Sequence, residues 1–320
     1  MDGPATGAPK TGVRFMKAKL GIAPIAWTND DLPELGGDTP LGVCLSESRL
    51  AGFTGVELGG KFPRTTPELR HVLDEHSLAL ASGWYSGTVL DNDVEAEKDQ
   101  ARAQLELFRD LDAPCIVYGE TAGTVQGQRD APLSTRRQLD EDQFRVYGRK
   151  LTLFAEHCAD VGVPLAFHHH MATAIETERD LDLLMASTGE AVGLLFDAGH
   201  MAFAGGDNRR VIANYGSRIV HVHTKDIRTE VMNALDRNSE SFLDAVLKGV
   251  FTVPGDGAID FDDIVKRIYD TGYEGWFVVE AEQDPVKAPP LEYARIGFKA
   301  LSSALAAAGY TVMGPDHESV

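Results

Sequence analysis

The sequence contains few cysteines and no long apolar segment. Only three of its 320 residues are cysteines (Cys44, Cys115 and Cys158), an odd number with wide spacing. They therefore form neither a disulfide framework nor a zinc ribbon, and a reducing cytoplasm is the expected location. No apolar run reaches the ~20 residues that a membrane-spanning helix needs, so we expect no membrane partner.

Basic residues and phosphate-binding motifs are scarce as well. The chain has 30 Lys and Arg against 49 Asp and Glu, a formal net charge of -19. This balance argues against nucleic acid or an anionic membrane surface as a partner, although an acidic surface also simply promotes solubility. The glycines of Gly119–Gly123 do not match the GxGxxG motif of dinucleotide-binding proteins, and no Walker A motif is present.

The sequence does contain a regular alternation of short apolar runs and helical segments. Eight runs have strand character: Leu20–Trp27, Gly55–Leu58, Leu78–Tyr85, Cys115–Glu120, Pro164–His170, Val192–His200, Ile219–Lys225 and Trp276–Glu282. Several are nearly continuous in apolar residues, as strands of a covered parallel sheet should be. Eight evenly spaced βα units predict a single-domain (β/α)8 TIM barrel over residues 17–310. They favour it over the alternative, a doubly wound open sheet.

Three segments lie outside the repeating unit. Residues 1–16 are rich in Gly, Pro and Thr and lack the apolar centre of a secretory signal, so we expect a flexible leader or a cloning remnant. Residues 229–253 form an insertion after the seventh strand, which we expect to be a lid or an extra helix over the barrel mouth. Residues 311–320 are expected to be a tail.

Histidines and acidic residues gather at the ends of the predicted strands. Six of the 10 histidines follow or end three successive strands: His168, His169, His170, His200, His221 and His223. Carboxylates end other strands or accompany these histidines: Glu57, Glu120, Asp197, Glu280 and Glu282. Active sites of such barrels lie at the carboxyl ends of the strands. The clustering therefore predicts a functional site there.

The alternation of side chains along a strand sorts these residues further. His168 and His170 share one face, whereas His169 points the other way and is expected to be structural. Asp197 follows Leu-Leu-Phe, and so buried a carboxylate is costly unless it is paired or bound to a metal. Nitrogen and carboxylate ligands from neighbouring strands suit manganese, cobalt, iron or zinc better than calcium.

Other candidates have simpler interpretations that stay open. His221 lies deeper in its strand and can be a hydrogen-bonded core residue. Lys225 with Asp226 can be an ion pair at the rim rather than part of the site. Trp27 can be a platform for substrate or simple packing. The carboxylates Glu57 and Glu120 can orient substrate or cap a loop.

Three motifs together resemble a known superfamily. LLFDAGH, IVHVHTKD and WFVVEAE are similar to segments of the xylose-isomerase-like sugar isomerases and epimerases, which are (β/α)8 barrels with a divalent metal. The resemblance implies metal ligands at Asp197, His223 and Glu280, and a substrate-contacting histidine at His200. The superfamily's strand-five glutamate is absent, and His168 occupies its place as the fourth expected ligand. The change puts a two-glutamate epimerase mechanism in doubt.

A closer resemblance covers nearly the whole chain after Lys17. GIAPIAWTNDDLPELGG, GFTGVELGGKFP, LAFHHHMAT, FTVPGDG and VVEAEQDP, in this order, resemble the inosose dehydratase family of myo-inositol catabolism. That family dehydrates 2-keto-myo-inositol (2-inosose), a cyclitol ketone, to a trihydroxycyclohexane-1,2-dione. The resemblance implies Mn²⁺ or Co²⁺ as cofactor and links glutathione to the activity. A homo-oligomer is the one protein partner it suggests.

The resemblance also implies roles for the remaining site residues. Glu280 or Glu282 is expected to be the base, and His170 or His200 the acid that protonates the departing hydroxyl, because a histidine near its ordinary pKa can donate a proton at neutral pH. The ring hydroxyls are expected to be held by four residues: Trp27, Glu57, Glu120 and Lys225. The alternatives are a metal-dependent ketose or inosose isomerase or epimerase, a DNA-repair endonuclease, and a sugar-binding barrel without activity. The acidic charge argues against the endonuclease.

Overall fold

Eight parallel strands close into a barrel. The computed structural model describes residues 16–314. The strands of the ring are β1 (Met16–Ile22), β2 (Gly55–Leu58), β3 (Ala79–Gly87), β4 (Ile116–Glu120), β5 (Leu165–His168), β6 (Val192–Asp197), β7 (Ile219–His223) and β10 (Gly275–Val279). Each pairs in parallel with the next, and β10 pairs back with β1. The predicted (β/α)8 barrel is confirmed, and the open sheet is excluded.

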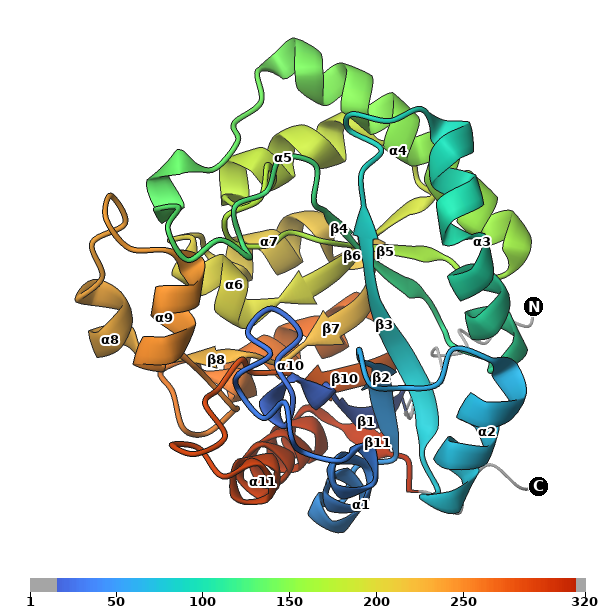
Figure 1. Cartoon of the computed structure of the whole chain (residues 1–320), viewed down its shortest axis with the longest axis vertical. Helices are drawn as coiled ribbons and strands as arrows, with labels where there is room; N and C mark the ends of the chain where they lie inside the picture. The colour runs from blue at the N-terminus through green and yellow to red at the C-terminus, as the bar shows by residue number, and fades with distance from the viewer. Residues whose placement is uncertain (1–15, 315–320) are drawn as a thin grey trace, which may run out of the picture.

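Helices surround this ring (Figure 1). They are α1 (Leu41–Ala51), α2 (Thr66–Glu75), α3 (Val94–Asp110), α4 (Glu141–Val161), α5 (Glu178–Ser187), α6 (Ala198–Phe203), α7 (Asn208–Tyr215), α10 (Phe261–Thr271) and α11 (Pro290–Ala308). Single 3-10 turns occur at η1 (Pro24–Ala26), η2 (Leu133–Thr135) and η3 (Gly216–Arg218). The helices cover the outer face of strands whose own residues are almost all buried.

Helix α4 illustrates why the sequence forms these elements. It begins with a capping box, in which the Asp140 side chain accepts from the amide of Gln143 and the Gln143 side chain accepts in return. It ends at Gly162, whose φ of 94° is a left-handed conformation that glycine adopts without strain. Between these ends, residues at helical spacing such as Phe144 and Leu151 are fully buried against the barrel.

The insertion after β7 packs over the carboxyl end of the barrel. It contains α8 (Thr229–Asn233) and α9 (Phe242–Lys248), and the short strands β8 (Asp226–Ile227) and β9 (Phe251–Thr252) pair antiparallel at its base. Both helices lie on the same side of the barrel (Figure 1). Phe242 lies 5.1 Å from His170 between ring centroids, and Phe251 lies 5.4 Å from His200. The insertion therefore covers part of the predicted site.

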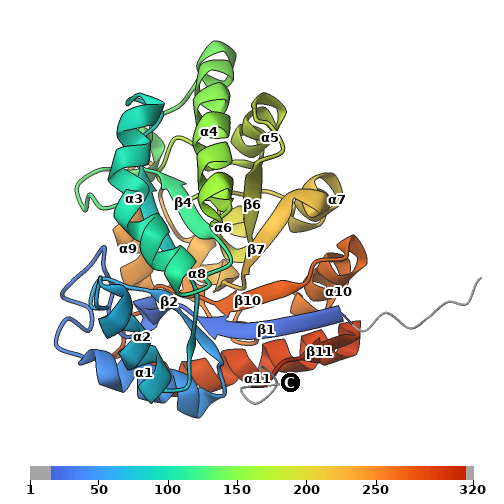
Figure 2. The same ribbon diagram turned by 90° about the vertical axis from the view of Figure 1, so that its right-hand side faces the viewer.

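The chain ends differ from the expected segments. The expected leader, residues 1–16, lies outside the described residues except for Met16, which already belongs to β1. A further strand, β11 (Tyr310–Val312), pairs with Met16–Ala18, so the sheet extends past residue 310 into the expected tail. Figure 2 shows α11 beside β1 and β11. Within residues 16–314, no helix has the length and apolar character to cross a membrane.

Candidate metal centre and active site

The pairing of the strands brings three predicted ligands to one point. Asp197 at the end of β6 pairs in register with His223 at the end of β7. His223 also pairs with Val278 of β10, two residues before Glu280. Residues two apart on a strand point the same way, so Glu280 joins the other two. Asp197, His223 and Glu280 each offer one ligand atom, and these three atoms lie within 4.8 Å of one another.

Besides Oε2 of Glu280, which lies 2.7 Å from Nζ of Lys225, two of these ligand atoms have no hydrogen-bond partner in the described chain. They are Oδ2 of Asp197 and Nδ1 of His223, 3.7 Å apart, and both are buried. Buried polar atoms are normally satisfied, and leaving one unpaired is costly. A divalent cation would pair both atoms at once. The mixed oxygen and nitrogen set suits a transition metal such as Mn²⁺, Co²⁺ or Zn²⁺.

His168 adjoins this group as the fourth predicted ligand. Its Nδ1 donates to the carbonyl of His169 at 2.6 Å, which leaves Nε2 without a proton in the neutral ring. That Nε2 lies 3.5 Å from Oδ2 of Asp197. His168 forms a second potential metal-binding group with Asp197 and His200, so Asp197 is common to both groups.

Glu57 orients the histidine of the centre. Its Oε1 accepts from Nε2 of His223 at 3.0 Å and from Nε2 of His221 at 2.9 Å. Burial alone would raise the pKa of Glu57 and lower the pKa of His223. The two histidines nevertheless hold the pKa of Glu57 well below its usual range, and Glu57 raises the pKa of His223. The bond to Nε2 directs Nδ1 of His223 toward Asp197. A carboxylate behind a metal-binding histidine fixes its tautomer in this way.

The side chain of Lys225 is completely buried, beside the carboxylates of Glu280 and Glu282. Its Nζ lies 2.7 Å from Oε2 of Glu280 and 2.5 Å from Oε2 of Glu282, and it donates to Nε2 of His200 at 2.7 Å. Burial alone would lower its pKa, but Glu280 and Glu282 raise the pKa of Lys225 above its usual value. The lysine therefore offsets part of the charge of these two carboxylates, although burial and the neighbouring Glu282 still raise the pKa of Glu280 to about 8.

His170, His200 and Glu282 form the part of the site expected to move protons. The two imidazoles lie 4.2 Å apart between ring centroids. Oε1 of Glu282 is 3.9 Å from Nε2 of His170 and 3.7 Å from Nε2 of His200. Burial lowers the pKa of both histidines well below the usual value. This direction runs against the expectation of a histidine with an ordinary pKa, because a lowered pKa favours neutral rings.

A cavity of about 120 Å³ opens beside these groups. Of the residues expected to bind substrate, Glu57 lines it. Trp27 and Glu120 do not: the indole of Trp27 is buried and donates to Glu47 on α1, and Glu120 accepts from the amides of Leu90 and Ala122. Lys225 is likewise outside the lining and bonded to protein groups. A larger cavity of about 510 Å³, near Lys19 and Trp276, contains none of the clustered histidines.

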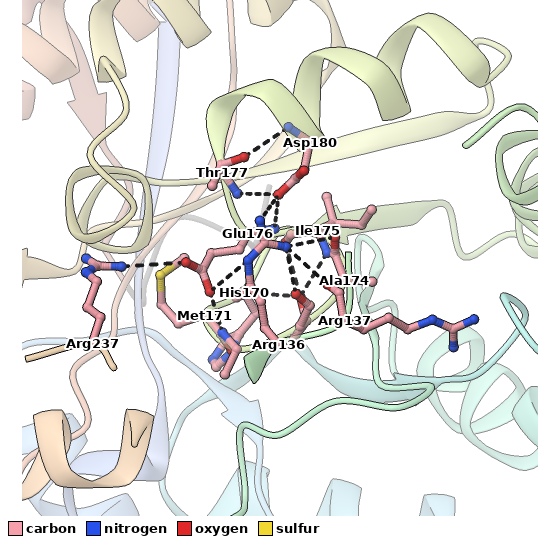
Figure 3. A network of polar contacts seen from close by, with 12 residues as sticks. Arg136, Arg137, His170, Met171, Ala174, Ile175, Glu176, Thr177, Asp180 and Arg237 are labelled. Carbon is pink, nitrogen blue, oxygen red and sulfur yellow. Dashed lines mark hydrogen bonds and ion pairs between the residues drawn. The ribbon is translucent and has the colours of Figure 1, made fainter. Parts of the chain in front are cut away.

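An ionic network, buried except at Arg237, holds the loop that follows β5 (Figure 3). Oε2 of Glu176 accepts from the amide of Ala172 at 2.7 Å, and Oε1 lies 3.6 Å from Nη1 of Arg237 in the insertion. Arg136 lies 3.7 Å from Glu176 and 2.8 Å from Asp180. Ala172 has a φ of 62°, a conformation rare for residues other than glycine. The network thus fixes a strained turn directly behind the histidine run.

This turn sets the direction of the His170 ring. Nδ1 of His170 donates to the carbonyl of Met171 at 3.0 Å, so Nε2 points toward Glu282. Glu176 and Arg136 were not predicted as site residues, because both lie in loops, where the sequence has no periodic spacing. Asp31 and Gln126, which line the cavity, were missed for the same reason. No signal in the sequence alone identifies them.

Comparison with known proteins places this barrel in a family. The family model for the xylose isomerase-like TIM barrel matches residues 45–310. The chain belongs to that family. Among solved structures, the IolI protein with a bound zinc atom superposes with a TM-score of 0.58 at 16% identity, covering 91% of this chain and 98% of that one. This likeness concerns the fold alone.

Relatives of higher sequence identity indicate which members of this family the chain resembles. The rhizopine catabolism protein MocC of Rhizobium meliloti is 52% identical over 303 residues, which make up 94% of this chain and 93% of MocC. The inosose dehydratase of Geobacillus thermodenitrificans is 44% identical over 280 residues, 87% of this chain and 94% of that protein. Within its family, the chain thus groups with inosose dehydratases and MocC, and it is an enzyme of the hydro-lyase class.

Proposed function

We propose that the protein dehydrates 2-keto-myo-inositol to a trihydroxycyclohexane-1,2-dione, in a metal-dependent reaction of myo-inositol catabolism. The observation that carries the proposal is the convergence of Asp197, His223 and Glu280 at the barrel mouth, beside a cavity. The identity to inosose dehydratases over most of both chains supports the choice of substrate.

The proposed metal ligands are Asp197, His223, Glu280 and His168. A divalent metal held there would act as a Lewis acid and would stabilise negative charge on the oxygen of the substrate ketone. Glu57 keeps Nδ1 of His223 directed at the centre, and Lys225 offsets the charge of the neighbouring carboxylates. Mn²⁺ and Co²⁺ are the ions we propose, and glutathione is tested as an addition to the assay.

The elimination needs a base for the α-hydrogen and an acid for the β-hydroxyl. Glu282 or Glu280 takes the α-proton as the carbon–hydrogen bond breaks. The carbon–oxygen bond to the β-hydroxyl then breaks, and His170 or His200 supplies the proton with which that hydroxyl leaves as water. The neutral imidazole receives that proton from the glutamate that has taken the α-proton, and Oε1 of Glu282 is within 3.9 Å of both rings. The enol that remains tautomerises to the dione.

The test is a dehydratase assay with metal-stripped protein and 2-inosose. Ultraviolet absorbance of the enol form of the product is followed with and without added Mn²⁺ or Co²⁺, and with and without glutathione. We expect a rise that depends on the metal. An isomerase or epimerase would instead exchange substrate carbon-bound hydrogen with deuterated solvent without losing water, and that result would overturn the proposal.

The cellular location is proposed from the state of the cysteines. The three cysteines are buried and free, which fits a reducing cytoplasm. Fractionation of cells that express the intact chain tests this location, and a periplasmic or secreted signal would contradict it. A homo-oligomer remains a prediction, and sedimentation equilibrium of the purified chain tests it.

A further inference from the structure

Two polar side chains beside the cavity make no hydrogen bond or ion pair in the described chain. Gln126 is 8% exposed and lines the cavity, and its Oε1 is buried without a partner. Asp31 also lines the cavity, and no side chain or backbone amide within residues 16–314 hydrogen-bonds to its carboxylate. Buried polar groups are satisfied in the great majority of cases, so an unsatisfied amide that faces a cavity requires an explanation.

The backbones of both residues are nevertheless held firmly. The amides of Asp31 and Leu32 donate to Oδ1 of Asn29 at 2.9 and 3.0 Å, which fixes the loop after η1. The amide of Gln126 donates to Oγ1 of Thr124 at 3.2 Å. The neighbouring amide of Val125 is bonded as well, to a carbonyl of the turn behind the histidine run. The two side chains are therefore positioned at the cavity, but they make no hydrogen bond or ion pair with the rest of the described chain.

We propose that Asp31 and Gln126 form a subsite that binds the substrate hydroxyls remote from the reacting carbons. The inference rests on the proposed function and specifies how the ring is recognised. A hydroxyl both donates and accepts, a carboxylate accepts only, and a primary amide does both. Together they can bind two neighbouring hydroxyls of a polyhydroxylated ring. The same cavity is lined by His223 and Glu280, so one ring can reach the subsite and the reacting groups together.

The subsite gives the enzyme a means of selecting fully hydroxylated rings. A site built to bond a substrate hydroxyl discriminates strongly against an analogue that lacks it, because the polar groups of the site are then left unpaired. The wild-type enzyme should therefore reject those monodeoxy inososes that lack a hydroxyl bonded by Asp31 or Gln126. Deoxygenation at the other remote positions should cost less.

The experiment combines variants with substrates in a double-mutant cycle. The variants are Asp31→Ala, Asp31→Asn and Gln126→Leu, and the substrates are 2-inosose and its monodeoxy analogues at each remote position. Gln128→Leu is the matched control, because Gln128 is exposed, lies outside the lining, and its side chain donates only to the carbonyl of Thr124. Circular dichroism and Mn²⁺ binding establish that each variant is folded and retains the metal centre.

On 2-inosose, Asp31→Ala and Gln126→Leu should lose about 10- to 100-fold in kcat/KM, the range for a hydrogen bond left unmade in a buried site. For each variant, one deoxy analogue lacks the hydroxyl that the replaced side chain binds. On that analogue, the kcat/KM values of wild type and variant should differ by less than about threefold. Equal losses on every substrate, or kcat/KM values for both variants equal to those of Gln128→Leu, would overturn the subsite.

A separate measurement distinguishes failure of the subsite from failure of the proposed function. Calorimetry with 2-inosose reports binding whether or not the ring reacts. If the wild-type protein binds it without turnover and both variants bind it about 10-fold more weakly, the subsite stands and the dehydratase reaction falls. If the wild-type protein neither binds nor converts it, both are overturned.

Discussion

Removal of the Glu176 carboxylate should destabilise the protein by about 3 to 4 kcal/mol. The change to alanine leaves the buried amide of Ala172 without its acceptor at 2.7 Å, which costs about 1 to 3 kcal/mol. It also removes an acidic partner from Arg136 and from Arg237, and breaking a buried ion pair costs about 3 to 5 kcal/mol. Arg136 keeps Asp180 at 2.8 Å, so the upper part of that range is not reached.

The assay is urea unfolding of Glu176→Ala and Glu176→Gln at neutral pH, without metal. The glutamine can still accept from the Ala172 amide, so it should lose only about 1 to 2 kcal/mol. Glu190→Ala is the control, because Glu190 is an exposed member of an ion pair with Arg218 and should change stability by less than about 0.5 kcal/mol. Equal losses in both Glu176 variants, or a loss under about 1 kcal/mol in the alanine variant, would refute this reasoning.

Three further perturbations have defined outcomes. Glu57→Gln should weaken Mn²⁺ binding by about 10- to 100-fold in calorimetry, since it removes the carboxylate behind His223, and an unchanged affinity would contradict that role. Burial raises the pKa of Glu120 to about 7, so its contribution to stability is fully present below the unfolded value of about 4.5 and is lost as the pH rises through 7. Relative to wild type, Glu120→Gln should therefore gain about 2 to 3 kcal/mol in unfolding free energy between pH 5 and pH 8, and a constant difference would argue against the shift. Gly119→Ala should lower stability by about 1 to 3 kcal/mol in thermal unfolding, because an added Cβ would lie 1.9 Å from the ring of Trp84, whereas a neutral result would mean that the ring moves freely.

The barrel, and the convergence of the residues proposed to bind a metal, could be predicted from local sequence patterns. Asp197 and Glu280 each follow directly after a buried apolar run. A carboxylate at the end of a strand can be recognised in the sequence, because the apolar pattern of a strand involves only neighbouring residues. His223 joins them because parallel strands of a barrel end at one rim. The domain limits at residues 17 and 310 remain predictions, although β11 extends the sheet to Val312.

The partners of the remaining site residues could not be read in this way. Lys225 was open to interpretation as a rim ion pair with Asp226, yet it pairs with Glu280 and Glu282, which follow β10. Asp226 instead accepts from backbone amides, including that of Ile259. These partners are set by contacts between distant segments, which neither periodicity nor residue type reveals.

The pairing of β1 with β10 and β11 also constrains the order in which the protein can be made. β1 is synthesised first, but β10 begins about 250 residues later at Gly275, and β11 follows at Tyr310. At a synthesis rate of roughly 5 to 20 residues per second, one edge of β1 stays without its partner strand for on the order of 10 to 50 s. An unpaired strand edge is a template for association with other chains. We therefore expect this edge of β1 to need protection from other chains until the ring can close.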